Sequence, residues 1–186
     1  MKLFDLKGKT AIVTGGNGGI GLGIARGLSE AGANLVIVGR NVQKNQKAVA
    51  SLRAENRSCL GLTCDVSRKE DIDRCIEETL TEFGRIDILV NNAGAAWGAE
   101  FETFPEQGWD KVMDVNVKAM FFLTQRLLPQ LRAAASAEDT ARVINIGSVD
   151  GLRIPRSSNF SYSASKAAVH HMTRVLGNEL ASDNIS

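Results

Sequence analysis

The sequence predicts an α/β fold in which a doubly wound parallel sheet is covered by helices on both faces. Short apolar runs recur along the chain, segments with helical periodicity separate them, and the first run ends in glycines. Near-continuous apolar runs are typical of strands buried on both faces, and helical crossovers between strands produce a parallel sheet. Because such crossovers are right-handed, we expect ligands to bind at the carboxyl ends of the strands.

Strands and helices are expected in alternation within one domain, residues 1–186. The strands are expected at 10–15, 34–39, 58–65, 85–94 and 141–148, and helices at 19–32, 42–55 and 161–182, with two more ending near residues 83 and 134. Ser67 with Glu70, and Thr103 with Glu106, have the spacing of capping boxes. We expect these two pairs to begin the third and fourth helices, the fourth with Pro105 in its first turn.

Composition and charge exclude several classes of function. The chain is 44% hydrophobic and 23% charged with a net charge of +1, so nothing indicates binding to nucleic acid or to a membrane surface. No apolar run reaches the ~18 residues of a membrane helix, and the N-terminus does not resemble a signal peptide. Cys59, Cys64 and Cys75 lack metal-ligand spacing, and adjacent His170 and His171 point in different directions on a helix. We therefore expect a cytoplasmic protein with free thiols and no metal site.

The stretch "TGGNGGIG", Thr14 to Gly21, joins the first strand to the first helix. Glycines let the backbone approach a diphosphate, and a helix N-terminus favours an anion. The alternative is a tight turn that binds no ligand. The candidate cofactor residues in this loop are Gly15, Asn17, Gly19, Ile20 and Gly21.

The end of the second strand bears on the choice of cofactor. An acidic residue there favours NAD, whereas this chain has Arg40, whose guanidinium suits a 2′-phosphate and stacks on adenine. NADP(H) is therefore expected over NAD(H), with Asn41 beside it. The alternatives are a solvated Arg40 and an Asn41 that only caps the next helix. After the third strand, Asp65 is expected beside Val66 to accept from the adenine amino group, or else to cap the following helix.

The fourth strand leads into "NNAG", residues 91–94, which is good turn chemistry by itself. At the end of a central strand it is also suited to a wall behind the ribose of a cofactor. Asn92, Ala93 and Gly94 are the candidates. Trp97, just beyond, is expected either to line a substrate cleft or to pack within its loop.

Ser148, Tyr162 and Lys166 form the strongest catalytic pattern. Tyr162 and Lys166 are four residues apart and share a helix face. A free phenol has a pKa of about 10 and is a poor base near neutral pH, and a nearby ammonium favours its ionised form. Ser148 is placed to hydrogen-bond the oxygen that exchanges the proton. Asn116, a polar residue in an apolar stretch, is expected to steady a water that links Lys166 to solvent, or to be a satisfied core asparagine.

Together these residues resemble the short-chain dehydrogenase/reductase family, from about residue 7 to residue 186. The T-G-x-x-x-G-x-G loop, the N-N-A-G segment and the Asn-Ser-Tyr-x-x-x-Lys set all match, with Asn116, Ser148, Tyr162 and Lys166 in the last. The resemblance implies a Rossmann fold and an oxidoreductase acting on a carbonyl or secondary alcohol. It further implies that Tyr162 is the acid/base, that Lys166 binds the nicotinamide ribose, that Ser148 orients the substrate and that Asn116 supports a proton relay.

The segments around 97–117 and 142–155 look most like 3-oxoacyl-(acyl-carrier-protein) reductases, and the N-terminal part resembles gluconate-type dehydrogenases. The family resemblance also implies a homodimer or homotetramer. Family members continue beyond "ASDNIS" with a sixth strand, a lid and a seventh strand, so the chain is expected to be C-terminally incomplete. Exposed apolar surface and an unpaired sheet edge are expected at strand five or at the last helix. The alternative function is therefore a non-catalytic nucleotide-binding or assembly protein, or an inactive fragment.

Overall fold

The computed structural model describes residues 5–55, 57–155 and 157–186. In these residues five parallel strands form one sheet in the order β3-β2-β1-β4-β5. The strands are β1 (Thr10–Thr14), β2 (Asn34–Gly39), β3 (Cys59–Thr63), β4 (Ile88–Asn91) and β5 (Arg142–Asn145). The sequence order reverses between β1 and β4, which confirms the doubly wound sheet that the sequence predicts.

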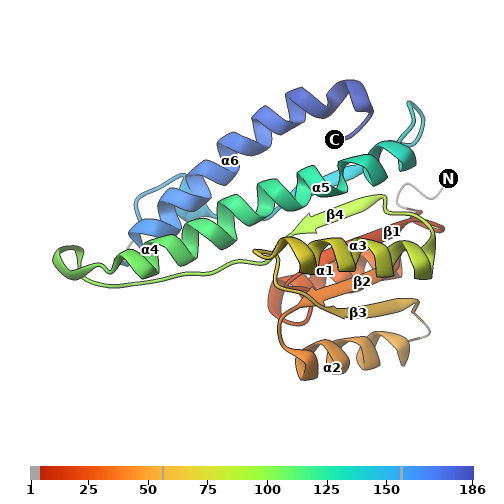
Figure 1. Ribbon diagram of the computed structural model, residues 1–186, viewed down its shortest axis with the longest axis horizontal. Coiled ribbons are helices and arrows are strands. Elements are labelled where there is room, and N and C mark those ends of the chain that lie inside the picture. The colour runs from red at the N-terminus through yellow and green to blue at the C-terminus, as the bar shows by residue number, and fades with distance from the viewer. Residues whose placement is uncertain (1–4, 56, 156) are drawn as a thin grey trace.

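The helices are α1 (Gly19–Glu30), α2 (Val42–Arg53), α3 (Lys69–Phe83), α4 (Glu106–Met113), α5 (Ala119–Ala134) and α6 (Phe160–Leu180). Figure 1 shows the segment between β4 and α4 extending away from the sheet, with α6 packed against α4. None of the described helices combines the length and apolar character needed to cross a membrane.

The core consists of two apolar layers, one on each face of the sheet. Residues of α1 and α2, such as Ala25 and Leu52, pack on one face. Residues of α3 and α5, such as Ile76 and Leu127, pack on the other. The central strand β1 is buried along its whole length, in agreement with the apolar run Ala11 to Val13 at its centre.

Both expected capping boxes are wrong. The third helix begins at Lys69 without a side-chain cap, because the Ser67 hydroxyl and amide both donate to Asp65 instead. The fourth begins at Glu106, also without a side-chain cap, and Thr103 lies in a separate 3₁₀ turn, Phe101–Thr103. The turn before the third helix thus takes the Ser67 side chain that was expected to cap it, and Thr103 belongs to a turn of its own.

The expected long fourth helix is also interrupted. A π-helical turn, Asp114–Lys118, separates α4 from α5, and the Ala119 amide bonds the Asp114 carbonyl five residues back. Single π-helical turns inside α-helices are frequent at functional sites. This turn places Asn116 at its centre and buries it.

Strand β5 is the exposed edge of the described sheet. Its outward residue Ile144 is 40% exposed, which agrees with the expected apolar surface at the fifth strand. Ile185 forms a parallel bridge with Ala141, and the Val143 amide donates to the Ser186 carbonyl over 2.8 Å. The last two residues therefore already lie along this edge.

Candidate functional site

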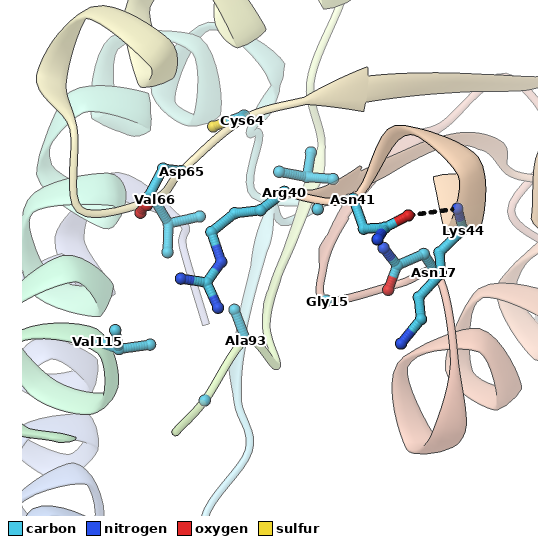
Figure 2. Close-up of a pocket in the computed structure, with 13 residues that line it drawn as sticks. Gly15, Asn17, Arg40, Asn41, Lys44, Cys64, Asp65, Val66, Ala93 and Val115 are labelled. Atoms are coloured by element: carbon cyan, nitrogen blue, oxygen red, sulfur yellow. Dashed lines mark hydrogen bonds between the residues drawn. The ribbon is translucent and has the colours of Figure 1, made fainter. Parts of the chain in front are cut away.

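A cavity lies where the carboxyl ends of β1, β2, β3 and β4 meet (Figure 2). Eight of the residues predicted from the sequence line it, and they come from four separate loops: Gly15, Asn17, Arg40, Asn41, Asp65, Val66, Ala93 and Gly94. Lys44, Cys64 and Val115 line it as well and were not predicted. Figure 2 shows the Arg40 side chain reaching across the cavity between Val66 and Ala93.

The other predicted cofactor residues lie outside the lining of this cavity. Gly19, Ile20 and Gly21 form the first turn of α1, and Ile20 is 71% exposed. Asn92 lies behind Gly15 and points at its backbone. Tyr162 and Lys166 lie on α6, on the side of the sheet covered by α5.

Glycine is required at two points of the first loop. Gly15 has a φ of 62° and Gly19 a φ of 51°, a backbone region that other residues rarely adopt. A Cβ on Gly21 would lie 2.3 Å from the Gly15 carbonyl oxygen. This close approach lets α1 begin directly after β1, with no side-chain cap and no acidic residue in its first turn. Its N-terminal amides are therefore suited to an anion.

The N-N-A-G turn is joined to the glycine loop by Thr14. The Thr14 hydroxyl donates to the Val90 carbonyl and accepts from the amides of Asn92 and Ala93, both over 2.9 Å. The Asn92 side chain donates to the carbonyls of Thr14 and Gly15. These bonds join the loops that follow two adjacent strands into one wall of the cavity. The asparagine side chain of the N-N-A-G turn therefore has a structural role in this wall.

Two cations and three asparagines surround the end of β2. Asn41 caps α2 by accepting from the Lys44 amide, so its expected capping role is confirmed while it also lines the cavity. Buried Asn45 donates to the carbonyls of Gly39 and Leu62 and accepts from Asn17 over 2.7 Å. The Asn41 cap places Lys44 in the first turn of α2, beside exposed Arg40. Lys44 was recognisable from the sequence as a second basic residue within one turn of that cap.

Asp65 uses one carboxylate oxygen for its own turn. Oδ1 accepts from the Ser67 amide and hydroxyl, and the Asp65 amide donates to Asp71. That amide bond is the main reason why the pKa of the Asp71 carboxyl lies below its usual value. No described protein group bonds Asp65 Oδ2, so both expected roles, the local turn and a contact to adenine, are compatible with this geometry.

Lys166 connects α6 to the end of the sheet. It is 7% exposed, and its Nζ donates to the Ile146 carbonyl over 2.6 Å and lies 5.7 Å from the centre of the Tyr162 ring. Burial lowers the pKa of the Lys166 ammonium below its ordinary value. Tyr162 and Lys166 thus face the same side of α6, toward the strand that leads to Ser148.

Ser148 lies in the turn that follows β5. Its Oγ accepts from the Asp150 amide over 3.2 Å, which leaves the hydroxyl hydrogen available for another acceptor. The 3₁₀ turn Val149–Gly151 rests on the backbone of α6 beside Lys166, where a Cβ on Gly151 would lie 2.6 Å from the Lys166 carbonyl carbon. The turn and the helix are therefore packed in direct contact.

The Asn116 amide is fully engaged by protein groups. It accepts from the Ala95 amide and donates to the Ala95 carbonyl and to Ser165 Oγ. Of the two roles expected for Asn116, this pattern supports that of a core asparagine whose hydrogen bonds are satisfied. The role in a proton relay stays a prediction. Trp97 packs over Gly108 with Lys111 5.5 Å from its ring centre, so it is a packed loop residue.

The residues of the cavity fit the adenosine and diphosphate part of a nicotinamide dinucleotide. The glycine loop leaves room for a phosphate next to the backbone, and Arg40 and Lys44 supply positive charge at the end of β2. Among the described residues there is no group of three or more His, Cys, Asp or Glu side chains placed to hold a metal ion. The three cysteines are free, as expected from the sequence, and the structure buries all of them.

Gly21→Ala is expected to damage the loop, because the new Cβ would collide with the Gly15 carbonyl and with the Asn92 amide that bonds this carbonyl. We expect a loss of about 1–3 kcal/mol in the free energy of unfolding and weaker NADPH binding, measured by thermal melting and nucleotide fluorescence. Gly23→Ala is the matched control, since no atom lies within 4 Å of its Cβ, and it should stabilise the protein by about 0.5–1 kcal/mol. Equal effects of the two variants would contradict the close-approach argument.

Lys166→Met is expected to change how stability depends on pH. Because burial lowers the pKa of Lys166, the unfolded chain binds more protons than the folded one between the folded pKa and about 10.4. In that window the free energy of unfolding of the parent should rise with pH relative to Lys166→Met, by at most about 1.4 kcal/mol per pH unit. Denaturant melts between about pH 8 and pH 10 measure this, and exposed Lys47→Met should keep the parent slope.

Comparison with known proteins gives the family. Residues 9–186 match the short chain dehydrogenase family. The chain is 44% identical over 183 residues to the rhamnolipids biosynthesis 3-oxoacyl-(acyl-carrier-protein) reductase of Pseudomonas aeruginosa, covering 98% of this chain and 71% of that protein. It is 38% identical over 190 residues to the 2-dehydro-3-deoxy-D-gluconate 5-dehydrogenase of Dickeya dadantii, covering 100% of this chain and 71% of that protein.

Two solved structures have the same fold. The Pseudomonas aeruginosa RhlG/NADP active-site complex superposes with a TM-score of 0.95 at 43% identity, covering 100% of this chain and 72% of that chain. The 3-ketoacyl-(acyl-carrier-protein) reductase of Brucella melitensis complexed with NADH gives a TM-score of 0.89 at 31% identity, covering 97% and 73%. With its sheet order, its glycine loop and this level of identity over nearly its whole length, the chain belongs to the short-chain dehydrogenase family.

Proposed function

We propose that this chain is an NADP(H)-dependent oxidoreductase that interconverts a carbonyl and a secondary alcohol, with Tyr162 as the acid/base. The observation that carries the proposal is the contact of Lys166 with both the Tyr162 face of α6 and the Ile146 carbonyl, two residues before Ser148. A buried cation beside a phenol and a hydroxyl is an arrangement that supports proton exchange with a substrate oxygen.

In the direction of reduction, bound NADPH would supply the hydride to the carbonyl carbon. Ser148 would donate its hydroxyl hydrogen to the substrate oxygen, since its Oγ already accepts from the Asp150 amide. Tyr162 would transfer its phenolic proton to that oxygen as negative charge develops there. Lys166 would stabilise the phenolate left behind, and oxidation would reverse each proton transfer.

A 3-oxoacyl substrate is proposed over a sugar acid because the relative with the higher identity is a 3-oxoacyl reductase. The preference for NADP(H) rests on Arg40 and Lys44, which line the cavity at the position where an acidic residue would favour NAD(H). One structural neighbour was solved with NADP and another with NADH, which supports dinucleotide binding in general.

The second candidate function is non-catalytic nucleotide binding or assembly. The cavity supports nucleotide binding, and the exposed apolar side chains beside Ser148 support assembly. Leu152 is 71% exposed and Ile154 is 94% exposed. This second candidate predicts NADPH binding without turnover. A single domain over 1–186, a cytoplasmic location and a homodimer or homotetramer remain part of the proposal.

Tyr162→Phe tests the catalytic role. Removing a general acid is expected to lower turnover of a 3-oxoacyl or other ketone substrate by roughly 10²–10⁴-fold, while NADPH affinity stays within about twofold of the parent. NADPH oxidation at a fixed ketone concentration measures turnover, and Ser163→Ala on the next residue serves as the control. Turnover retained in Tyr162→Phe would contradict the assignment, and binding without turnover in the parent would favour the second candidate.

Arg40→Asp tests the cofactor preference. Losing a charge-assisted contact to the 2′-phosphate and adding a repulsive carboxylate should weaken NADPH binding by about tenfold to a hundredfold. NADH affinity should stay constant or improve, since a carboxylate at this position accepts from the ribose hydroxyls. Fluorescence titration with both nucleotides gives the ratio. Lys47→Asp makes the same charge change on the exposed side of α2 and is the matched control. An equal loss of NADPH affinity in Lys47→Asp would mean that net charge, and not a contact of Arg40, sets the preference.

A further inference from the structure

We infer that His170 is a positioning residue that fixes Ser148 through the backbone. The Ser148 amide donates to Nε2 of His170 over 3.3 Å, and this contact spans 22 residues of sequence. The inference rests on the proposed function for its catalytic consequence, while the contact itself can be measured independently.

The contact follows from where the parallel ladder stops. Strand β4 ends at Asn91, and the Ile146 amide makes the last bond to it, over 3.0 Å. Beyond that point the Ile146 carbonyl and the Ser148 amide have no strand partner in β4. Lys166 bonds the first and His170 the second. Two side chains of α6 therefore take the place of a strand.

Tyr162, Lys166 and His170 follow one another at intervals of four residues and thus lie along one face of α6. The last two hold the segment that carries Ser148, and the first is the proposed acid/base. One helix face consequently sets the spacing between the tyrosine and the serine.

Gly147 supplies a second observation that points to the same contact. A Cβ at this position would lie 2.3 Å from His170 Nε2 and 2.7 Å from its Cδ2. Only a glycine lets the imidazole come close enough to accept from the next amide. Accepting at Nε2 requires a neutral ring with its hydrogen on Nδ1, so the imidazole acts here as a hydrogen-bond acceptor.

The contact is tested first without any assay of turnover. In His170→Leu the Ser148 amide loses its acceptor, and its hydrogen exchange should become roughly fivefold faster, as expected for one lost hydrogen bond. The Ile146 amide, which bonds Asn91, is the internal reference and should not change. His171→Leu removes the neighbouring exposed histidine and is the matched control. An unchanged Ser148 exchange rate in His170→Leu overturns the inference.

The catalytic consequence is tested with NADPH and a ketone. A displaced serine should lower kcat by roughly tenfold to a hundredfold, with the Kd for NADPH and the melting temperature close to those of the parent. His170→Gln places an amide oxygen near the same amide and should recover part of kcat, which a purely structural role would not predict. Equal losses in kcat for His170→Gln and His170→Leu, or a loss in His171→Leu, overturn the positioning role.

Gly147→Ala provides a second route if His170→Leu folds poorly. The added methyl should displace the ring and lower kcat in the parent, but it should have little effect in His170→Ala, where the ring is gone. Additive effects would overturn the inference. If the parent itself shows no turnover, the proposed function fails, and the amide exchange still decides whether His170 holds Ser148.

Discussion

The site depends on a buried ammonium at the point where the central sheet ends. Lys166 meets the Ile146 carbonyl just beyond the last ladder bond of β4, and this contact fixes α6 relative to β5. Burying a cation is unfavourable, and the lowered pKa of Lys166 reflects that penalty. A neutral side chain of similar length would pack there more easily, yet it would neither bond the carbonyl nor favour an ionised Tyr162 one turn earlier. The position of α6 and the electrostatic environment of Tyr162 therefore both depend on the contact of Lys166 with the Ile146 carbonyl.

The nucleotide side depends on a different constraint, the close approach of backbones. Gly21 lies against the Gly15 carbonyl, and Thr14 and Asn92 bond the two loops that meet there. Because these contacts use side chains and carbonyls, the first amides of α1 remain directed outward. The glycine pattern alone would not hold these amides in that direction. The geometry that suits an anion arises from the glycine loop and the N-N-A-G turn together.

Periodicity and motif position predicted most of the fold and the cavity. The expected strand at 34–39 coincides with β2, and residues from four loops meet as anticipated. The first capping box failed because Asp65 competes for Ser67, and the second failed because Thr103 lies in a separate turn. Spacing alone carries no information about either. The π-helical turn at 114–118 inserts one extra residue into an otherwise continuous apolar pattern, so periodicity does not reveal it. His170 was considered only as a metal ligand, since its contact depends on how α6 crosses the end of β5.

The proposed nucleotide site and the surface beyond Ser148 differ in how far they are enclosed. Loops joined by hydrogen bonds and the cap of α2 form the walls of the cavity. On the other side of Ser148, Val149, Leu152 and Ile154 are 51%, 71% and 94% exposed. Proton exchange at Tyr162 benefits from exclusion of water, because charges act more strongly in a dry site. Under the proposed function, shielding these three side chains from water would therefore raise the rate of the chemical step, whereas affinity for the adenosine and diphosphate part of the nucleotide would depend on the residues that line the cavity.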